Sequence, residues 1–468
     1  MKMQTHKYKT NDDSQQKIVA RIGQRILSEA NDLKRTFDSI SDELQIDIEK
    51  FNNVMSGKAS YDEAIELAKL ISTNYPVKLG DLILEMPDTD RGLMLMRKEA
   101  SEISKRVFSR LDQDQNRTPY YEYRDTATAT LSPFKPEWIE ELRVVEDNRP
   151  ENPDVAYNNG HFLHQMTAFI GPVNFYWELN GEKYSKEMNT GSSNYITPFV
   201  KHSFTSRDSS KQAIIIAVTF SSDAGRSRGE FYSMGNERLQ SYVLDNRQPD
   251  SAISKLIHQV LNDKCISVKN LKEISKANNA DLDLDQLLSP NYPKSEDDIS
   301  KLANLLNLKP SLFELPVHEL DDVVVKDKNQ NEAYIYNSNK KEPDYIINPL
   351  AVSSRLPSIS GFDMEIASLN RDHASILESS LHTYIYNYGA TSFEFYWIYE
   401  GKEYQETIYP DDSIYLEPFI KHKFFRSFSS NANIFMFRVP GAINLSVQKE
   451  ISSYANSSRI IESKPWFN

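Results

Sequence analysis

Apolar residues recur every three or four positions in two stretches of the chain, residues 17–84 and residues 250–306. This spacing predicts short amphipathic helices, for example DEAIELAKLI in the first stretch and DDISKLANLL in the second. Gly57 is placed to end one helix of the first stretch. Short helices with short connections favour a helix-turn-helix-like bundle in each stretch. The charged segment 97–111 (RKEASEISKRVFSRL) is predicted to be a connecting helix.

The segments that follow the two bundles have the composition of β-strands and repeat each other. NFYWELNGEKY (174–184) matches EFYWIYEGKEY (394–404), and YITPFVKHSF (195–204) matches YLEPFIKHKF (415–424). Both pairs lie 220 residues apart, 174 to 394 and 195 to 415. The chain is therefore predicted to be a tandem duplication of one helical bundle plus one antiparallel β-barrel.

The predicted fold class is α+β, with five segments. They are a disordered tail at 1–14, a helical bundle at 15–100, a barrel at 101–225, a second bundle at 226–317, and a second barrel with a C-terminal helix at 318–468.

Composition narrows the class of protein. With 468 residues, 39% of them hydrophobic, the chain is long enough for several packed domains. A net charge of −13 argues against nucleic acid or an anionic membrane as partner, and the helix that would read DNA, DIEKFNNVM, carries two acids. One cysteine excludes an intramolecular disulfide, and the chain has neither an 18-residue apolar run nor a signal-peptide core. We expect a cytoplasmic protein.

A candidate metal site lies in the first barrel. NNGHFLHQ (158–165) offers His161 and Gln165 just before a strand, and His202 ends a later strand. Two imidazoles and one oxygen donor can form one face of an octahedron, as in non-heme Fe(II) oxygenases. Each histidine alone is more often a packed or surface residue, so the interpretation depends on the combination. The residues alone leave Mn, Co and Ni open beside Fe(II).

The duplication provides an internal comparison for this site. His422 matches His202, but Ser379 and Thr383 stand where the first copy has His161 and Gln165. We therefore expect one metal site, in the first barrel, and a metal-free second barrel; the alternative is that both are metal-free. Thr197, which matches Glu417, cannot supply a carboxylate, so Gln165 is the candidate oxygen donor.

These residues resemble those of the phosphonate-oxidising cupins, a family that joins helix-turn-helix-like bundles to cupin barrels. The resemblance covers nearly the whole chain, and its most specific motif is Asn-x-Gly-His, here Asn158 to His161. It implies a double-stranded β-helix that holds Fe(II) and acts on a phosphonate with O2. A Gln four residues after the first His, here Gln165, is similar to the branch that converts 2-hydroxyethylphosphonate to methylphosphonate and CO2 without an external reductant.

The resemblance also implies residues that bind the substrate. They are Lys34 from the first bundle, Arg117, Tyr123, Asn158 and Tyr195. Arg117 is the nearest arginine to the family's position, although the spacing is shorter, so which arginine binds the phosphonate stays open. No catalytic residue beyond the metal ligands is implied.

Two other functions stay open. Dioxygenase chemistry on the same fold would give hydroxymethylphosphonate and formate. A cupin regulator that binds a small ligand and DNA would also combine a bundle with a barrel, although such regulators usually need one copy and a basic reading helix. The oligomeric state is not fixed by the sequence, and a homo-oligomer is compatible with it.

Overall fold

The computed structural model describes residues 12–83, 87–245, 247–315, 322–329, 332–336, 343–356, 358–372, 374–426 and 432–454. The chain forms two compact units. One comprises the chain up to Arg91, Ala129–Ser132 and the segment from Gly441; the other comprises Gly92–Thr128 and Pro133–Pro440. The C-terminal helix, α13 (Leu445–Ile451), thus groups with the first bundle and not, as predicted, with the second barrel. Residues 1–11 of the predicted tail lie outside the described residues, and the first helix already begins at Asp12.

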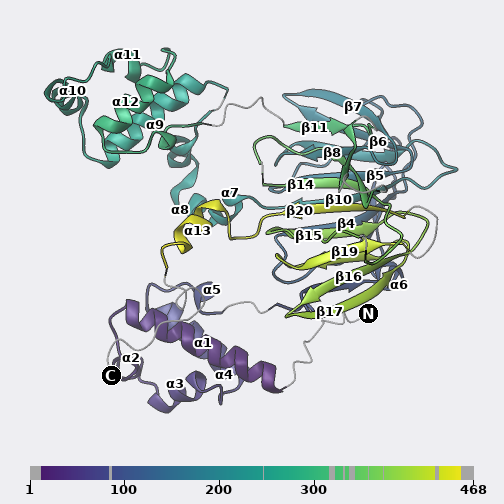
Figure 1. The fold of residues 1–468 in the computed structure, drawn as a ribbon, viewed down its shortest axis with the longest axis horizontal. Helices are drawn as coiled ribbons and strands as arrows, with labels where there is room; N and C mark the ends of the chain where they lie inside the picture. Colours follow the sequence, from purple (N-terminus) through teal and green to yellow (C-terminus); the bar gives the residue numbers. More distant parts are fainter. Residues whose placement is uncertain are drawn as a thin grey trace. The chain divides into compact units, whose positions relative to one another are not determined.

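The first predicted bundle consists of α1 (Asp12–Asp32), α2 (Phe37–Leu44), α3 (Ile48–Met55), α4 (Tyr61–Asn74) and α5 (Leu79–Leu82) (Figure 1). Its helices begin where side-chain caps occur. Ser60 accepts from the backbone of Glu63, whose carboxylate accepts in return from the backbone of Ser60. Gly57, with φ +70°, follows the end of α3 as predicted.

The second predicted bundle consists of α9 (Pro249–Asp263), α10 (Val268–Ala277), α11 (Leu284–Leu288) and α12 (Glu296–Leu305), preceded by α7 (Asp223–Arg226) and α8 (Arg228–Leu239) (Figure 1). Short 3-10 turns lie at Gln240–Tyr242 and Pro310–Leu312. Its apolar positions meet in one core that contains Ile257, Leu271, Leu287 and Leu302. No helix in the described part of the chain is both long and apolar enough to cross a lipid bilayer.

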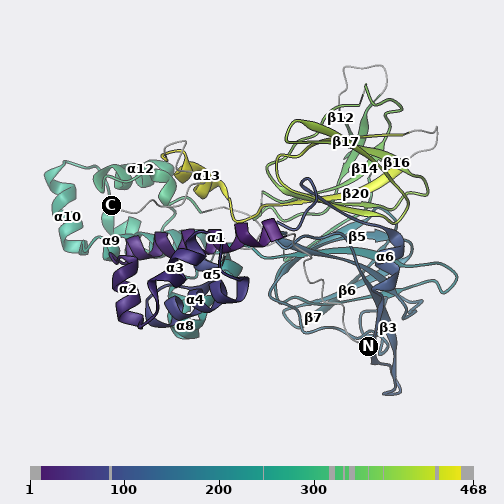
Figure 2. The ribbon, with the colours of Figure 1, turned by 90° about the horizontal axis from the view of Figure 1, so that it is seen from below.

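The β-structure forms two sets of antiparallel sheets with the same order of strands. In the first set, which we call the first β unit, a seven-stranded sheet has the order β11-β8-β5-β10-β4-β3-β2 and a three-stranded sheet the order β7-β6-β9. In the second β unit the orders are β1-β18-β15-β20-β14-β13-β12 and β17-β16-β19. Figure 2 shows the strands of the two units as two separate groups. The repeat read from the sequence is thus present in the sheets.

The bounds of the strands follow. In the first half they are β1 (Leu93–Met96), β2 (Arg106–Leu111), β3 (Arg117–Asp125), β4 (Phe134–Glu141), β5 (His164–Ile170), β6 (Val173–Leu179), β7 (Glu182–Met188), β8 (Ser193–Ile196), β9 (Lys201–Ser206) and β10 (Ile214–Phe220). In the second half they are β11 (Val323–Lys326), β12 (Tyr334–Tyr336), β13 (Tyr345–Pro349), β14 (Ser360–Ile366), β15 (His382–Asn387), β16 (Phe393–Tyr399), β17 (Lys402–Ile408), β18 (Ser413–Leu416), β19 (Lys421–Phe425) and β20 (Ala432–Val439).

Two short strands are exchanged between the two β units. Strand β1 follows the first bundle but pairs with β18 of the second β unit, with Leu93 opposite Leu416. Strand β11 follows the second bundle but pairs with β8 of the first β unit, with Val323 opposite Ile196. Each sheet is therefore completed by a strand from the other half of the chain.

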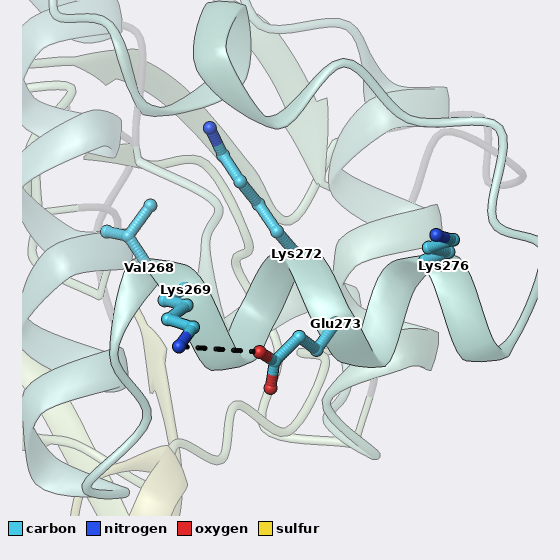
Figure 3. A pocket seen from close by; sticks show the side chains of 5 residues that line it. All are labelled: Val268, Lys269, Lys272, Glu273 and Lys276. Atoms are coloured by element: carbon cyan, nitrogen blue, oxygen red, sulfur yellow. Dashed lines mark ion pairs between the residues drawn. The ribbon is translucent and has the colours of Figure 1, made fainter.

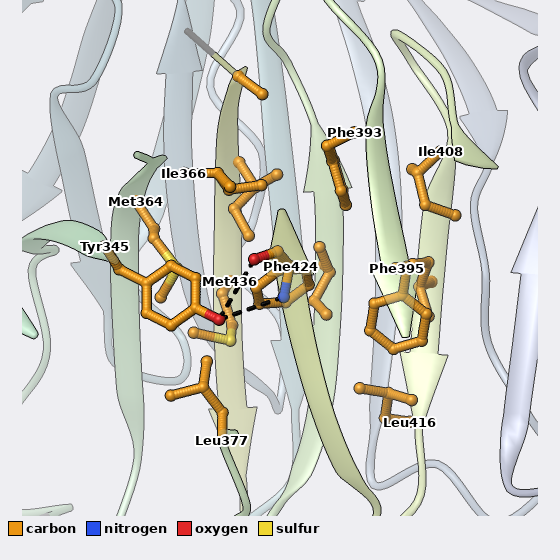
Figure 4. Packing of buried hydrophobic residues seen from close by; sticks show 14 of the residues in the cluster. Tyr345, Met364, Ile366, Leu377, Phe393, Phe395, Ile408, Leu416, Phe424 and Met436 are labelled. Carbon is orange, nitrogen blue, oxygen red and sulfur yellow. Dashed lines mark hydrogen bonds between the residues drawn. The ribbon is translucent and has the colours of Figure 1, made fainter. Parts of the chain in front are cut away.

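Side chains alternate between the two faces of each strand, and the inward faces form the core of each unit. Figure 4 shows this packing in the second β unit, where the hydroxyl of Tyr345 donates to the backbone carbonyl of Phe424 at 3.4 Å. The backbone N–H of Phe424 donates to the same phenol at 3.2 Å, and Phe204 donates to Tyr121 at 3.1 Å in the first unit. Matched contacts of this kind support the internal repeat.

The predicted connecting helix over 97–111 is wrong in its second half. Only Lys98–Ile103 is helical (α6), and the chain then enters strand β2. The alternation of Arg106, Phe108 and Arg110 places these side chains on one face of a strand, whereas their charges suggested an exposed helix. Strand β2 contributes Arg110 to the candidate site.

One buried acid stands out in the first β unit. Glu141 on β4 is 4% exposed, and neither of its carboxyl oxygens has a hydrogen-bond partner in the described part of the chain. Burial raises the pKa of Glu141 well above its usual value, and the nearby Glu140 adds to this rise. Burial therefore favours the protonated, uncharged form of this carboxyl group.

This raised pKa predicts a pH-dependent stability. The carboxyl loses its proton near pH 4.5 in the unfolded chain and at a higher pH in the folded one, so its contribution to stability is full below pH 4.5 and is lost as pH rises through the folded pKa. Glu141→Gln should therefore raise Tm by about 2–5 °C at pH 8 and change it little at pH 4.5. Thermal unfolding from pH 4.5 to 8.5 measures this, with Glu182→Gln on exposed β7 as the surface control. Parallel profiles for the Glu141→Gln and wild-type proteins would contradict the prediction.

Candidate metal centre

A cavity of about 120 Å³ opens inside the first β unit. It is lined by side chains from β2, β3, β4, β5, β9, β10 and the loop before β5, namely Arg110, Tyr121, Tyr123, Glu137, Ile139, Asn158, His161, Gln165, His202, Phe204, Ile215, Ala217 and Thr219. The structure thus brings together five of the eight residues named from the sequence.

The two histidines present lone pairs to this cavity. His161 donates its Nδ1–H to the carbonyl of Leu163 at 2.9 Å, and His202 donates its Nδ1–H to the carbonyl of Val200 at 2.9 Å. In a neutral imidazole this leaves Nε2 unprotonated, the form that binds a metal. The rings lie 5.4 Å apart and nearly perpendicular. Burial lowers the pKa of His202 to about 4, which keeps it neutral.

Gln165 supplies the oxygen. Its Nε2 donates to the hydroxyl of Thr167 at 2.9 Å, which leaves Oε1 3.3 Å from His161 Nε2. Two acceptor atoms then face each other, an arrangement that a cation between them would stabilise. Gln165 and Thr167 are both inward-facing residues of β5, two positions apart. The strand itself therefore positions the amide.

A glycine allows the loop to bring His161 to this point. Gly160 has φ +71°, and a Cβ there would lie 2.6 Å from the carbonyl carbon of Phe199. The carbonyl of His161 accepts from the backbone of Phe199 at 2.9 Å. Only glycine combines this backbone conformation with so close an approach.

Asn158 is fixed beside the ligands. Its Oδ1 accepts from the backbone of Gly160 at 2.9 Å and of His202 at 3.0 Å. Its Nδ2 donates one hydrogen to His202 Nε2 at 3.0 Å and keeps a second hydrogen for another acceptor. It is placed to donate to a ligand bound next to this histidine.

These donors fit a first-row metal ion. Among the described residues, no three His, Cys, Asp or Glu side chains converge on a point that could hold a metal ion. Here the third donor is an amide oxygen, and all three donors are neutral. Two imidazoles and one oxygen leave further coordination positions open to a substrate.

A cation faces the same cavity. The guanidinium carbon of Arg110 lies 5.6 Å from the ring centroid of Tyr120 and 5.5 Å from that of Tyr121. The sequence interpretation missed Arg110, because β2 was taken as a helix. Tyr123 lines the cavity beside it, and burial raises the pKa of its phenol, which stays protonated and able to donate. Arg110, Tyr123 and Asn158 can together bind an oxyanion.

Two residues named from the sequence, Arg117 and Tyr195, do not line this cavity, and a third, Lys34, is not tested. Arg117 is exposed at the start of β3 and is not among the lining residues. Tyr195 lies on the opposite face of the sheet, because it alternates with the inward-facing Ile196, and its phenol is 2.7 Å from His164 Nδ1. Lys34 belongs to the other compact unit, so its role stays a prediction.

A larger hollow of about 450 Å³ on α10 is a weaker candidate. Figure 3 shows that Lys269, Lys272, Glu273 and Lys276 line it from one helix. Lys269 and Glu273 form an exposed ion pair at 4.0 Å, and Lys272 pairs with Asp285. All the residues that line this hollow are exposed, so it is a solvated helix face.

The chain is similar to a curated relative and to solved structures. No family model matches the chain. Methylphosphonate synthase of Nitrosopumilus maritimus is 34% identical over 462 residues, 96% of each chain. The structure of Streptomyces albus hydroxyethylphosphonate dioxygenase with 2-hydroxyethylphosphonate and Fe(II) bound has a TM-score of 0.85 at 27% identity, covering 98% of this chain and all of that one.

A second solved structure, a variant of 2-hydroxyethylphosphonate dioxygenase, has a TM-score of 0.69 at 16% identity and shows the same fold over 94% of this chain and 98% of its own. The relative at 34% identity is matched over 96% of this chain. The chain belongs to the methylphosphonate synthase family.

Proposed function

We propose that this chain is an Fe(II)-dependent oxygenase that cleaves 2-hydroxyethylphosphonate with O2 to methylphosphonate and CO2. The observation that carries the proposal is the convergence of His161, Gln165 and His202 in a chain that is 34% identical to a methylphosphonate synthase over 96% of its length. Per turnover, one substrate and one O2 give methylphosphonate, CO2 and water. The substrate supplies all the electrons that O2 takes up, so no reductant is needed.

His161 Nε2, Gln165 Oε1 and His202 Nε2 would hold the iron. When bound, the iron supplies O2 activation and the electron transfer that C–C cleavage needs. A neutral amide in place of a carboxylate leaves the centre one charge more positive. Thr167 keeps the amide oxygen, and not its NH2 group, toward the site.

The phosphonate would bind to Arg110, Asn158 and Tyr123. A guanidinium can donate two parallel hydrogen bonds to a phosphonate, and the Asn158 amide adds a donor next to His202. Arg110 takes the role first expected of Arg117. Lys34 is kept as a further predicted contact, and Tyr195 is not, because its phenol already binds His164.

We also infer that each half of the chain is a helix-turn-helix-like bundle followed by a cupin double-stranded β-helix. The identical strand orders of the two β units and the capped short helices before each support this inference. The boundaries 15–100, 101–225, 226–317 and 318–468 stay approximate, since strands β1 and β11 lie near them and cross between the units.

Product analysis tests the reaction. Anaerobic loading with Fe(II), followed by 2-hydroxyethylphosphonate and O2, should give a methylphosphonate signal in the phosphorus NMR spectrum and equimolar CO2. Gln165→Glu should change the products, because the ligand charge changes. Hydroxymethylphosphonate and formate from the wild-type protein would contradict the proposed reaction and favour dioxygenase chemistry.

The orientation of the Gln165 amide predicts an effect of Thr167 on metal affinity. Thr167→Val keeps the size but removes the hydroxyl that holds the amide, so Fe(II) binding should weaken by about 10- to 100-fold. Competition with a chromogenic chelator measures this under anaerobic conditions. Thr205→Val is the matched control, since Thr205 is equally buried but faces Tyr176. Equal affinity for both variants would contradict the role of Thr167.

Arg110 and Arg117 give a matched pair for the anion site. Arg110→Met should raise KM for the phosphonate by about 10- to 100-fold, because a charge-assisted hydrogen bond is lost. Arg117→Met should leave KM unchanged. Steady-state O2 consumption distinguishes the two, and a larger effect at Arg117 would show that the cavity has been assigned the wrong arginine.

A further inference from the structure

The second β unit holds a buried histidine with an unused ring nitrogen. His422 on β19 pairs with Trp397 as His202 pairs with Trp177, and it is 2% exposed. It donates its Nδ1–H to the carbonyl of Ile420 at 2.8 Å, so Nε2 is an acceptor. In the described part of the chain, Nε2 has no hydrogen-bond partner.

The other metal ligands are replaced in this unit. The carbonyl of Ser379 accepts from Phe419 as that of His161 accepts from Phe199, which confirms Ser379 as the counterpart of His161. Thr383 pairs with Leu416 as Gln165 pairs with Ile196. His422 is thus left without partner ligands, as the sequence indicated.

An arginine lies where the first unit has a small residue. Thr383 is opposite Arg438 in the β15–β20 pair, and Gln165 is opposite Thr219 in the β5–β10 pair. Thr219 lines the cavity of the first unit, so Arg438 projects from the matching inward position. His202 and Thr219 line one cavity in the first β unit, so the matching strand positions bring His422 and Arg438 to the same side of the second. Burial lowers the pKa of His422 to about 4, and the charge of Arg438 adds to this.

The guanidinium of Arg438 has unused donors. Its Nε and Nη2 are buried without a hydrogen-bond partner among the described residues, and no described carboxylate forms an ion pair with it. Its nearest aromatic contact is Phe362, with 5.8 Å between the guanidinium carbon and the ring centroid. Arg438 is partly exposed, but its two buried donors lack a counter-charge, so an anion that occupies this position would stabilise the fold.

The two groups together define the chemistry of a ligand. The Nε and Nη2 donors form the fork that matches two oxygens of a planar oxyanion. His422 Nε2 needs a donor, which a hydroxyl group on the same anion can supply. Hydrogencarbonate has both features, and so does a hydroxylated or singly protonated phosphonate.

Packing in this unit favours the smaller anion. Phe362 and Met364 occupy the strand positions of Glu137 and Ile139, and Met436 that of Ala217. Figure 4 shows Met364 and Met436 within the packed core. These larger side chains fill space that the first unit leaves open.

We propose that the second β unit binds one hydrogencarbonate-sized oxyanion between Arg438 and His422. The anion accepts two hydrogen bonds from the guanidinium and donates its hydroxyl proton in a hydrogen bond to His422 Nε2. This site contains no metal, and the proposal is independent of the reaction assigned to the first unit.

The test is anion-dependent stability of the metal-free full chain at constant pH and ionic strength. Hydrogencarbonate in the millimolar range should raise Tm saturably, and calorimetric titration of the Arg110→Met protein, whose first cavity lacks its arginine, should give one site. Arg438→Thr, which introduces the residue of the first unit, should abolish the response. Arg110→Met should retain it, because that arginine belongs to the other cavity.

The Arg438→Lys variant and a titration with 2-hydroxyethylphosphonate test the proposal further. Arg438→Lys keeps the charge without the fork and should weaken binding by about 10- to 100-fold, which covers the case in which Arg438→Thr does not fold. An equal response of wild-type and Arg438 variants, or no saturable binding, would overturn the proposal. So would titration with 2-hydroxyethylphosphonate if it, and not hydrogencarbonate, bound at an Arg438-dependent site.

Discussion

The exchange of β1 and β11 is the constraint on which the rest of the β-structure depends. Strand β8 lies between β5, which bears Gln165, and β11, which comes from the other half of the chain. Without β11 the sheet that carries the candidate centre would end in an exposed edge of unpaired backbone groups. The reciprocal pairing of β1 with β18 does the same for the second unit. Each half therefore needs a strand from the other half to complete its sheet.

Side chains that face inward and side chains that face outward along a strand have different roles in this structure. Inward residues of β5, Gln165 and Thr167, build the centre and fix its amide. Outward residues bind to the neighbouring strand, as His164 does with Tyr195 at 2.7 Å. The second unit keeps the outward contact, His382 with Tyr415 at 2.7 Å, although its inward ligands have changed. The outward faces thus preserve the architecture while the inward faces are free to differ.

The sequence was most informative where spacing is rigid. The repeat offset identified the duplication, and the short motif around Gly160 and His161 led to the residues that the cavity brings together. It was least informative at β2, where a charged strand resembled an exposed helix and concealed Arg110. Tyr195 was misplaced because its face depends on register, which a family position does not convey. The strand exchange links residues more than 300 positions apart for β1, such as Leu93 and Leu416, and no local pattern indicates it.

Gly160 also bears on the history of the chain. The second half has Glu378 immediately before Ser379, so a side chain stands where the first half accommodates none, although the backbone contact from Phe419 to Ser379 persists. Giving the second unit the ligand set of the first would require changes at Glu378, Ser379, Thr383 and Arg438, because all four positions differ between the halves. A single substitution among them would leave His422 with at most one further ligand.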